Sequence, residues 1–357
     1  MRHIAFFFIG ADRTEMAGAV ERGELPDSIL RGANFFAERA DFAVDTVSTH
    51  SVETAPPKFL HAIIPPSLVH LTLLPRLLRY DAVIASDGLL VGCVVSLLGR
   101  FRGRRPRWIL VAINTSTLIR RHAKHPVRRR ILRFCLKRCA AIVCLSQQQR
   151  HDLIRFGIRG NCLHEIRFGV DSAYWSKVSA NEGAVVLSIG KDSGRDYPTL
   201  LLAAERAGLP TVIIASKKNI PGSARIPENV KVLYDVPLGS LSDMYREARV
   251  VVVASLPDDS IFGTDCSGQT VVLESLAAGR PVIATHRSWL AEYLSPEDYV
   301  SVPAKDSEKL AEAMRRLWDD GHLRKRLAAH GARTVRERYS SRRYAEDLAA
   351  LVDTLLS

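Results

Sequence analysis

The sequence predicts an α/β protein built from two doubly wound parallel sheets, and three observations lead to this fold class. At 357 residues, of which 47% are hydrophobic, the chain is too long for one ordinary core and apolar enough for two. Strand-like apolar runs alternate with segments of helical spacing, as in parallel sheets covered on both faces. The alternation stops at a polar, turn-rich stretch at 168–183 and then begins again. We therefore expect two soluble domains joined by this linker.

The first domain opens with the strand-like run at 3–10. Its uncharged part at 4–11 is at the short limit for a signal peptide, and two charged residues follow at once. We therefore interpret it as a buried strand that ends at Gly10. Further strands are expected at 42–48, 80–86, 107–113 and 140–146. No stretch reaches the roughly 18 uninterrupted apolar residues that a membrane-spanning helix needs.

The second domain repeats this rhythm. Strands are expected at 183–190, 210–216, 229–235, 248–255 and 280–285. After Pro303 the apolar residues recur at i, i+3 and i+4, which predicts helices to the end of the chain. We expect domains at 1–176 and 177–338, followed by a terminal helix at 339–357. Because doubly wound sheets bind ligands beyond the carboxyl ends of their strands, we expect the site in a cleft between the domains.

Basic residues are concentrated in one part of the first domain. The net charge is +12, and fifteen Arg and Lys but no acidic residue lie between Asp87 and Asp152. Residues 120–138 have the pattern of a cationic amphipathic helix, which could lie on an anionic membrane surface or pack on the sheet with its basic side in water. Its apolar stripe is either Val127, Ile131, Cys135 and Cys139 or Leu132 and Leu136. We expect no nucleic acid partner, because no aromatic residues interleave with the charges.

The six cysteines show no C-x-x-C spacing and mostly lie in apolar surroundings, so neither a disulfide framework nor a zinc site is indicated. This usage indicates a reducing, cytoplasmic setting. The segment "PDD" at 257–259 is a candidate divalent-cation site, but acids in loops are more often solvated, and we expect no metal.

The segment "CSGQTVVLESLAAGRPVIAT" at 266–285 follows an expected strand and begins a helix near Gly268. The first N–H groups of a helix are unpaired and carry the positive end of its dipole, which suits a phosphate. Ser267, Gln269 and Thr270 can add side-chain hydrogen bonds. Glu274 lies one turn further on, where its carboxylate can accept bonds from two hydroxyls of a ribose. The alternative is an ordinary surface Glu in a helix.

A second cluster lies in "SIGKDSGRDYPTLL" at 188–201, directly after the first strand of the second domain. Gly190 and Gly194 allow a tight turn, and Lys191 and Arg195 bring two cations to it. This combination is suited to a diphosphate, although a solvated basic loop would have the same composition.

The order of these motifs resembles a known family. The segments 188–201, 236–255, 267–285 and 332–348 are similar to the second domain of the retaining nucleotide-sugar glycosyltransferases of family four, and "FGVDSAYW" at 168–175 resembles their linker. The resemblance implies the GT-B fold, in which two Rossmann-like domains face each other across a cleft and a C-terminal helix returns to the first domain. It also implies transfer of a sugar from a nucleoside diphosphate, of UDP or GDP type, to an acceptor hydroxyl with retention and without a metal or cofactor.

The resemblance assigns roles to individual residues. Lys191 and Arg195 would contact the donor diphosphate and stabilise the leaving group, beside Gly190. Glu274 would hold the ribose. The segment with Asp265, Cys266, Ser267, Gly268, Gln269 and Thr270 would meet the phosphates or the sugar. The backbone of Val236, Pro237 and Leu238 would face the base. Gly10 and Asn114 would lie on the acceptor side.

Two positions depart from the family pattern. Cys266 stands where the family has a Glu that positions the transferred sugar, and Asn114 stands where it often has a His. These departures motivate a second hypothesis, a non-catalytic protein that binds a nucleotide or a membrane. An epimerase on the same fold is a third. For the enzyme we expect a glycan or a lipid-linked or cell-envelope acceptor, and a cytoplasmic location, free or peripheral at the inner face of the membrane.

Overall fold

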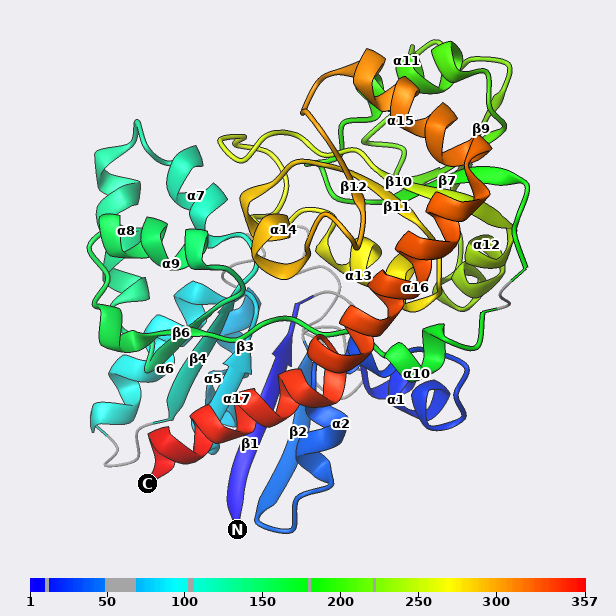
Figure 1. Ribbon diagram of the computed structural model, residues 1–357. Helices are drawn as coiled ribbons and strands as arrows, with labels where there is room; N and C mark the ends of the chain where they lie inside the picture. Colours follow the sequence, from blue (N-terminus) through cyan, green and yellow to red (C-terminus); the bar gives the residue numbers. More distant parts are fainter. Residues whose placement is uncertain (10–12, 49–68, 102–105, 179–180, 221–222) are drawn as a thin grey trace. The chain divides into compact units, whose positions relative to one another are not determined.

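The computed structural model describes residues 1–9, 13–48, 69–101, 106–178, 181–220 and 223–357 (Figure 1). The chain divides into two compact units. Unit 1 comprises Met1–Phe168 and Arg342–Ser357, and unit 2 comprises Gly169–Ser341. Each unit contains a six-stranded sheet in which every pairing is parallel, with helices in the connections. The fold class predicted from the alternation of strands and helices is therefore confirmed.

Main-chain contacts inside unit 2 explain where the division falls. The N–H of Val170 donates to the carbonyl of Tyr339 (2.9 Å), and the N–H of Ser341 donates to the carbonyl of Val170 (3.0 Å). Gly169 permits this approach, because a Cβ there would lie 2.1 Å from the carbonyl oxygen of Ser340. Unit 2 thus begins at Gly169 and ends at Ser341, whereas the sequence led us to expect 177 and 338.

The sheet of unit 1 has the order β2-β1-β3-β4-β5-β6. Its strands are β1 (Arg2–Phe8), β2 (Phe42–Ser48), β3 (Ala82–Ala85), β4 (Arg107–Ala112), β5 (Ala141–Cys144) and β6 (Leu163–Glu165). The first five match the expected segments, and β6 is too short to show a pattern. The buried ring of Trp108 on β4 lies against Gly92, where a Cβ would come within 2.3 Å of it. Gly92 belongs to helix α6 (Leu89–Phe101), and a glycine is needed there because the helix backbone crosses the Trp108 ring.

Helices surround this sheet. They are α1 (Arg13–Glu21), η1 (Asp27–Leu30), α2 (Ala33–Ala37), η2 (His70–Leu73), α5 (Leu74–Leu77), α6 (Leu89–Phe101), α7 (Thr115–Arg121), α8 (Pro126–Leu136), α9 (Gln147–Arg155) and η3 (Gly160–Cys162). No helix in the described ranges is long and apolar enough to cross a membrane.

The sheet of unit 2 has the order β12-β11-β10-β7-β8-β9. Its strands are β7 (Val185–Gly190), β8 (Thr211–Ala215), β9 (Val230–Tyr234), β10 (Ala248–Val253), β11 (Val282–Thr285) and β12 (Val300–Val302). The chain builds outward from β7 on one side and from β10 on the other. The order therefore reverses between β7 and β10, which is where a doubly wound sheet leaves a crevice for a ligand.

The helices of unit 2 are α10 (Ser172–Trp175), α11 (Tyr197–Ala207), η4 (Leu238–Ser240), α12 (Leu241–Glu247), α13 (Gln269–Ala277), α14 (Ser288–Tyr293), α15 (Ser307–Asp319) and α16 (Gly321–Arg338). Asp196, Asp306 and Asp320 cap α11, α15 and α16, each accepting a bond from a backbone N–H in the first turn. These caps fix the starts of helices that cover the sheet.

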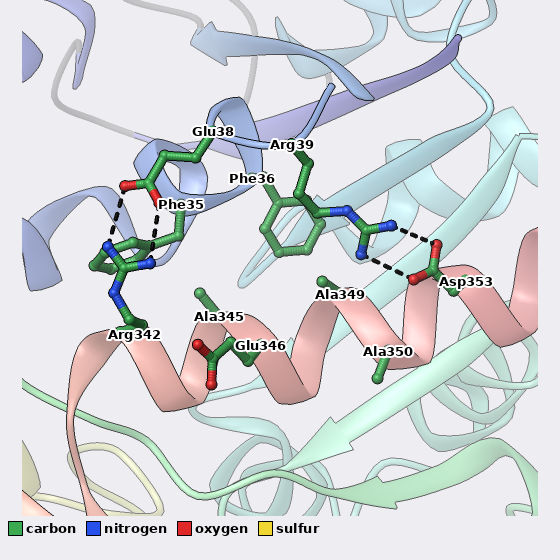
Figure 2. A pocket seen from close by; sticks show the side chains of 10 residues that line it. All are labelled: Phe35, Phe36, Glu38, Arg39, Arg342, Ala345, Glu346, Ala349, Ala350 and Asp353. Atoms are coloured by element: carbon green, nitrogen blue, oxygen red, sulfur yellow. Dashed lines mark hydrogen bonds and ion pairs between the residues drawn. The ribbon is translucent and has the colours of Figure 1, made fainter. Parts of the chain in front are cut away.

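The terminal helix α17 (Ser341–Leu356) packs almost entirely within unit 1. Arg39 pairs with Asp353 (2.8 Å) and Arg342 with Glu38 (3.0 Å), on either side of a pocket of about 430 Å³ between α2 and α17 (Figure 2). Alanines of α17, including Ala345, lie along this pocket. These two ion pairs attach α17 to the segment around α2. Because both arginines that line the pocket are already paired with carboxylates, neither is free to bind an anion there.

Candidate functional site

Arg195 is the centre of the candidate site. The loop after β7 carries it back toward the sheet, where its side chain is buried and Nη2 donates to the carbonyl of Ile189 (2.5 Å). The guanidinium lies on the backbone of Gly190, since a Cβ there would stand 2.1 Å from Nε. Its Nε and Nη1 are buried and have no hydrogen-bond partner in the described part of the chain. A buried, unpaired cation of this kind favours an anionic ligand.

The start of α13 lies against Arg195. Gly268 caps the helix with a φ of 87°, and a Cβ there would lie 3.0 Å from Nη1 of Arg195 and 2.6 Å from Cγ1 of Val253. The N–H of Gln269 donates to the carbonyl of Cys266 (3.0 Å), and the next N–H groups of the first turn and the positive end of the helix dipole join the guanidinium. Buried polar atoms of Gln269 (Nε2) and Ser255 (Oγ) also lack a partner among the described residues. This end of α13 is therefore rich in unused hydrogen-bonding groups.

Asp192 ties the two loops of the site together, and the sequence analysis missed it. Its Oδ1 accepts bonds from the N–H of Gly194 (2.7 Å) and from Oγ of Ser267 (2.9 Å). Gly194 and Gly263 approach so closely that a Cβ at Gly263 would lie 2.4 Å from Cα of Gly194. The D-x-G spacing of a side-chain turn was a signal that could have indicated this role.

Glu274 lies on α13 and is buried, so the interpretation as an ordinary surface Glu is wrong. Burial raises the pKa of Glu274 to about 8, and the hydroxyl of Tyr245 beside it partly offsets this rise. Tyr245 comes from α12 and is itself fully buried. The sequence analysis did not single it out, and only the packing of α12 beside the carboxyl reveals its place in the site.

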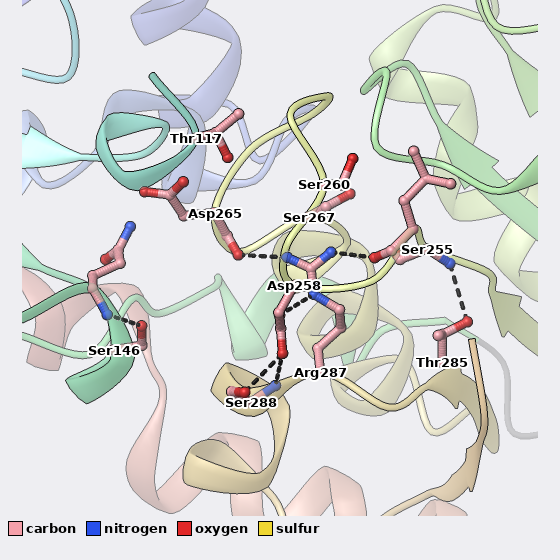
Figure 3. A network of polar contacts seen from close by, with 12 residues as sticks. Thr117, Ser146, Ser255, Asp258, Ser260, Asp265, Ser267, Thr285, Arg287 and Ser288 are labelled. Carbon is pink, nitrogen blue, oxygen red and sulfur yellow. Dashed lines mark hydrogen bonds and ion pairs between the residues drawn. The ribbon is translucent and has the colours of Figure 1, made fainter. Parts of the chain in front are cut away.

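Arg287 supports the loop that precedes α13 (Figure 3). Its side chain is buried, with Nη1 bonded to the carbonyl of Leu256 (2.5 Å) and Nη2 to that of Asp265 (2.8 Å). Asp258 pairs with its Nε (2.6 Å) and also accepts bonds from the N–H and Oγ of Ser288. One arginine thus holds both ends of the loop, and nothing in the sequence pattern predicted it.

At the candidate cation site "PDD", the carboxylate of Asp258 is already bound by Arg287 and Ser288 and does not stand free for a cation. Within the described ranges, no group of three or more His, Cys, Asp or Glu side chains could hold a metal ion.

The remaining residues expected in unit 2 lie around this centre. Lys191 and Thr270 are exposed, while Asp265, Cys266 and Ser267 are buried. The segment from Val236 to Leu238 follows β9, the edge strand two positions from β7. At the usual strand spacing this is about 10 Å away. The structure therefore brings Arg195, Gly190, Ser267 and Gly268 together and places 236–238 at the margin of the same sheet edge.

The two expected acceptor-side residues are in unit 1. Asn114 follows β4, is exposed and begins α7 without a capping side-chain bond. Gly10 lies outside the described residues.

The geometry of unit 2 can now be compared with known proteins. Residues 195–320 match the family described as glycosyl transferases group 1, and residues 22–169 match the glycosyl transferase 4-like domain. The chain belongs to the group 1 glycosyltransferases. The second match covers most of unit 1, where the sequence resemblance was loose.

Relatives of this group 1 glycosyltransferase include the lipopolysaccharide core biosynthesis glycosyltransferase LpsD of Rhizobium meliloti. The two are 38% identical over 86 residues, which is 23% of this chain and 24% of the relative. HepE of Anabaena, solved with UDP and glucose, has a TM-score of 0.72 and 14% identity over 99% of this chain and 100% of its own. Sucrose-phosphate synthase of Thermosynechococcus elongatus has a TM-score of 0.70 and 17% identity over 99% of both chains. These likenesses identify the fold as GT-B.

In the basic region of this glycosyltransferase, one of the two expected apolar stripes, that of Leu132 and Leu136, is buried. On α8, Leu132, Cys135 and Leu136 are buried in the core, as is Cys139 just beyond the helix. The stripe from Val127 to Cys139 is therefore not one face, because Val127 is 69% exposed while the two cysteines are buried. The outer face instead carries two apolar residues of that stripe together with a phenylalanine. They are Val127, Ile131 and Phe134, which are 69%, 55% and 46% exposed.

Proposed function

We propose that the protein is a retaining glycosyltransferase that moves a sugar from a nucleoside diphosphate, of UDP or GDP type, to an acceptor hydroxyl. The observation that carries the proposal is the buried guanidinium of Arg195, unpaired at Nε and Nη1 and set against the first turn of α13. Both lie where the strand order of unit 2 reverses, between β7 and β10. A diphosphate bound there would satisfy the guanidinium and the helix N-terminus together.

Negative charge builds on the diphosphate as the bond to the sugar breaks. Arg195 and the α13 dipole are fixed before the reaction, so they stabilise this charge without reorganising. Lys191, exposed on the same loop, adds a mobile cation. Because these groups supply positive charge at the phosphates, the proposed reaction needs neither a metal nor a cofactor. In retaining transfer of this type the leaving phosphate accepts the acceptor's proton, so Asn114 need not act as a base.

Glu274 is proposed to bind the ribose of the donor. Its carboxyl is buried one turn from the helix start, next to the hydroxyl of Tyr245. A carboxylate can accept bonds from both ribose hydroxyls, and those bonds would replace the solvation that burial removes. The base would then lie toward the segment 236–238, and the transferred sugar near Asp265, Cys266, Gln269 and Thr270.

The acceptor is proposed to be a glycan or lipid-linked sugar of the cell envelope. LpsD is named for lipopolysaccharide core biosynthesis, and a structural neighbour of Staphylococcus aureus, TarM, was solved with UDP and a GlcNAc-glycerol. Such acceptors would be met at the inner face of the cytoplasmic membrane.

The outer face of α8 supports a peripheral location. Val127, Ile131 and Phe134 are exposed there, and so are Arg128 and Arg130. Arg129 and Arg133 instead stack over the ring of Phe156 within unit 1. Apolar side chains interspersed with free cations suit an anionic lipid surface, to which each nearby charge contributes roughly 1 kcal/mol.

Binding of the donor is tested by a thermal-shift panel of UDP, GDP, ADP and NAD with and without magnesium, because a ligand that binds only the folded state raises the melting temperature. We expect one nucleoside diphosphate to stabilise the protein equally with and without the metal. Glu274→Ala should weaken that nucleotide by about 1–3 kcal/mol, while Glu205→Ala, on an exposed face of α11, should not. An unchanged affinity in Glu274→Ala would remove the ribose role.

Catalysis is tested separately from binding. The matching nucleotide sugar should be hydrolysed slowly without an acceptor, and NMR of the first product should show the anomeric configuration of the donor. Nucleotide binding without any turnover would favour the non-catalytic hypothesis, which Cys266 and Asn114 motivate. Turnover that releases an epimerised sugar would favour the epimerase.

The membrane location is tested by sedimentation with vesicles containing phosphatidylglycerol. Wild type should sediment, and a variant with Val127, Ile131 and Phe134 all changed to Ser should not. The control is Ile154→Ser on α9, since Ile154 is exposed to a similar degree. Absence of wild-type sedimentation would end this part of the proposal.

A further inference from the structure

Unit 1 has a strand-order reversal of its own, between β1 and β3. The two strands are adjacent and in register, with Phe7 opposite Ala85. Charged residues follow both carboxyl ends: Arg13 begins α1 after β1, and Asp87 follows β3. This is the position in unit 1 that corresponds topologically to the position of Arg195 in unit 2.

Arg13 is held in a fixed orientation. Its Nη1 donates to the carbonyl of Ile29 (2.7 Å), and its guanidinium lies 5.4 Å from the centre of the Phe8 ring. Its Nε is buried and has no hydrogen-bond partner among the described residues. Because Ile29 stands two residues before Arg31, this bond brings the Arg13 guanidinium to the segment that carries Arg31. Burial, and then the charge of Arg31, lower the pKa of Arg13.

Arg31 is the second cation of this cluster. It ends η1 with a φ of 52°, a left-handed conformation that favours glycine or asparagine and costs free energy in an arginine. Its Nη1 is buried without a hydrogen-bond partner in the described part of the chain. The carboxylate of Asp87 favours its cationic form, but no ion pair joins Asp87 and Arg31 in the structure as described.

Among the described residues, the carboxyl whose charge acts on Arg31 is that of Asp87, and burial raises the pKa of Asp87 more than Arg31 lowers it. Like charges that repel in a partly desolvated place are costly unless an anion accompanies them. A guanidinium pair also fits the planar or tetrahedral oxygens of a carboxylate or phosphate, to which arginine can donate two parallel bonds.

We propose that Arg13 and Arg31 form an anion subsite on the acceptor side of the enzyme, which binds a phosphate or carboxylate group carried by the acceptor sugar. That the bound anion belongs to an acceptor rests on the proposed transferase function. Binding of an anion by Arg13 and Arg31 does not depend on that function. Acceptors that are phosphorylated or contain an acidic sugar are therefore selected over neutral ones.

The test separates this subsite from the donor site. Binding of inorganic phosphate and of glucuronate is measured by calorimetry at constant ionic strength, in a background in which Arg195→Gln has removed the donor-site cation. Arg13→Gln and Arg31→Gln should each weaken the bound anion about tenfold, the value of one charge-assisted hydrogen bond. Gln is as unfavourable as Arg in the left-handed conformation, so the backbone cost at position 31 stays the same. The matched control is Arg22→Gln, on an exposed arginine that pairs with Glu24.

The outcomes are distinct. Tighter binding of phosphate supports a phosphorylated acceptor, and tighter binding of glucuronate supports an acidic sugar. If a Gln variant does not fold, Arg13→Lys and Arg31→Lys, which keep the charge and lose the paired bonds, should weaken binding to a smaller extent. The subsite is overturned if neither anion binds, or if the anion binds equally well with and without the changes at Arg13 and Arg31. This holds even if the nucleoside diphosphate panel succeeds. Failure of that panel with anion binding intact would overturn the donor site alone.

Discussion

The guanidinium of Arg195 lies directly on the backbone of Gly190, with no room between them for a methyl group. A Cβ at Gly190 would stand 2.1 Å from Nε and 2.8 Å from Cζ of Arg195. Gly190, the last residue of β7, and Arg195, which is proposed to bind the phosphates, therefore pack together as one structural unit. The glycine that ends the strand is what allows the cation to reach the start of α13.

Gly190→Ala should therefore displace Arg195 and weaken nucleoside diphosphate binding at least tenfold, with a loss of about 1–3 kcal/mol in unfolding free energy from overpacking. Both effects are measured on one protein, by titration with the nucleotide and by denaturant unfolding. Gly160→Ala serves as the control, because a Cβ there meets only the end of the Arg150 side chain at 3.6 Å. Unimpaired nucleotide affinity in Gly190→Ala would show that Arg195 does not contact the phosphates.

Much of this arrangement could be predicted from the sequence, since it depends on local patterns. Strand-like runs gave ten of the strands, and the loops after them gave Arg195 and Gly268. The edge strands β6 and β12 were missed because three residues are too few for a pattern. Asp192 was missed although its local D-x-G spacing is visible in the sequence. Tyr245 and Arg287 were missed for a different reason: each acts through a partner distant in sequence, and only tertiary packing brings the two together.

Glu274 should make stability depend on pH. Its pKa is about 8 in the folded protein and near 4.5 in an unfolded chain, so the folded state holds the proton over this window. Unfolding free energy should then fall as pH rises from 5 to 8, by up to about 1.4 kcal/mol per pH unit. In Glu274→Gln that part of the slope should be absent. Denaturant unfolding of both proteins at several pH values measures the difference, and parallel slopes would contradict the burial of an ionisable carboxyl.

Arg287 should control the order of the loop before α13. Arg287→Met removes two bonds to the carbonyls of Leu256 and Asp265 and leaves buried acceptors unpaired, at a cost of about 2–4 kcal/mol. Hydrogen exchange should increase in residues 256–268 and change little in unit 1. Asp258→Asn is the milder comparison, because Asp258 is 37% exposed and solvent can replace part of its pairing. Unchanged exchange in Arg287→Met would mean that the loop is held by other contacts.

Asp298 should stabilise the folded protein at neutral pH and lose this effect in acid. Its carboxylate is buried and accepts bonds from the N–H and Oγ of Ser295, from Oγ1 of Thr334 and from Nδ1 of His330. These bonds hold the pKa of Asp298 below its ordinary value in spite of burial. The stabilisation is therefore complete above the ordinary pKa of 3.8 and is lost as the pH falls through the lower folded value.

Asp298→Asn keeps the shape but loses the charge, so it should cost about 2–3 kcal/mol at pH 7 and less at pH 3. The measurement is denaturant unfolding at both pH values, with Asp306→Asn as control. Asp306 caps the start of α15 by accepting a bond from the N–H of Lys309, and asparagine is an equally good cap there. A loss of equal size at pH 7 and pH 3 would indicate that packing, and not the ionised carboxylate, is what Asp298 contributes.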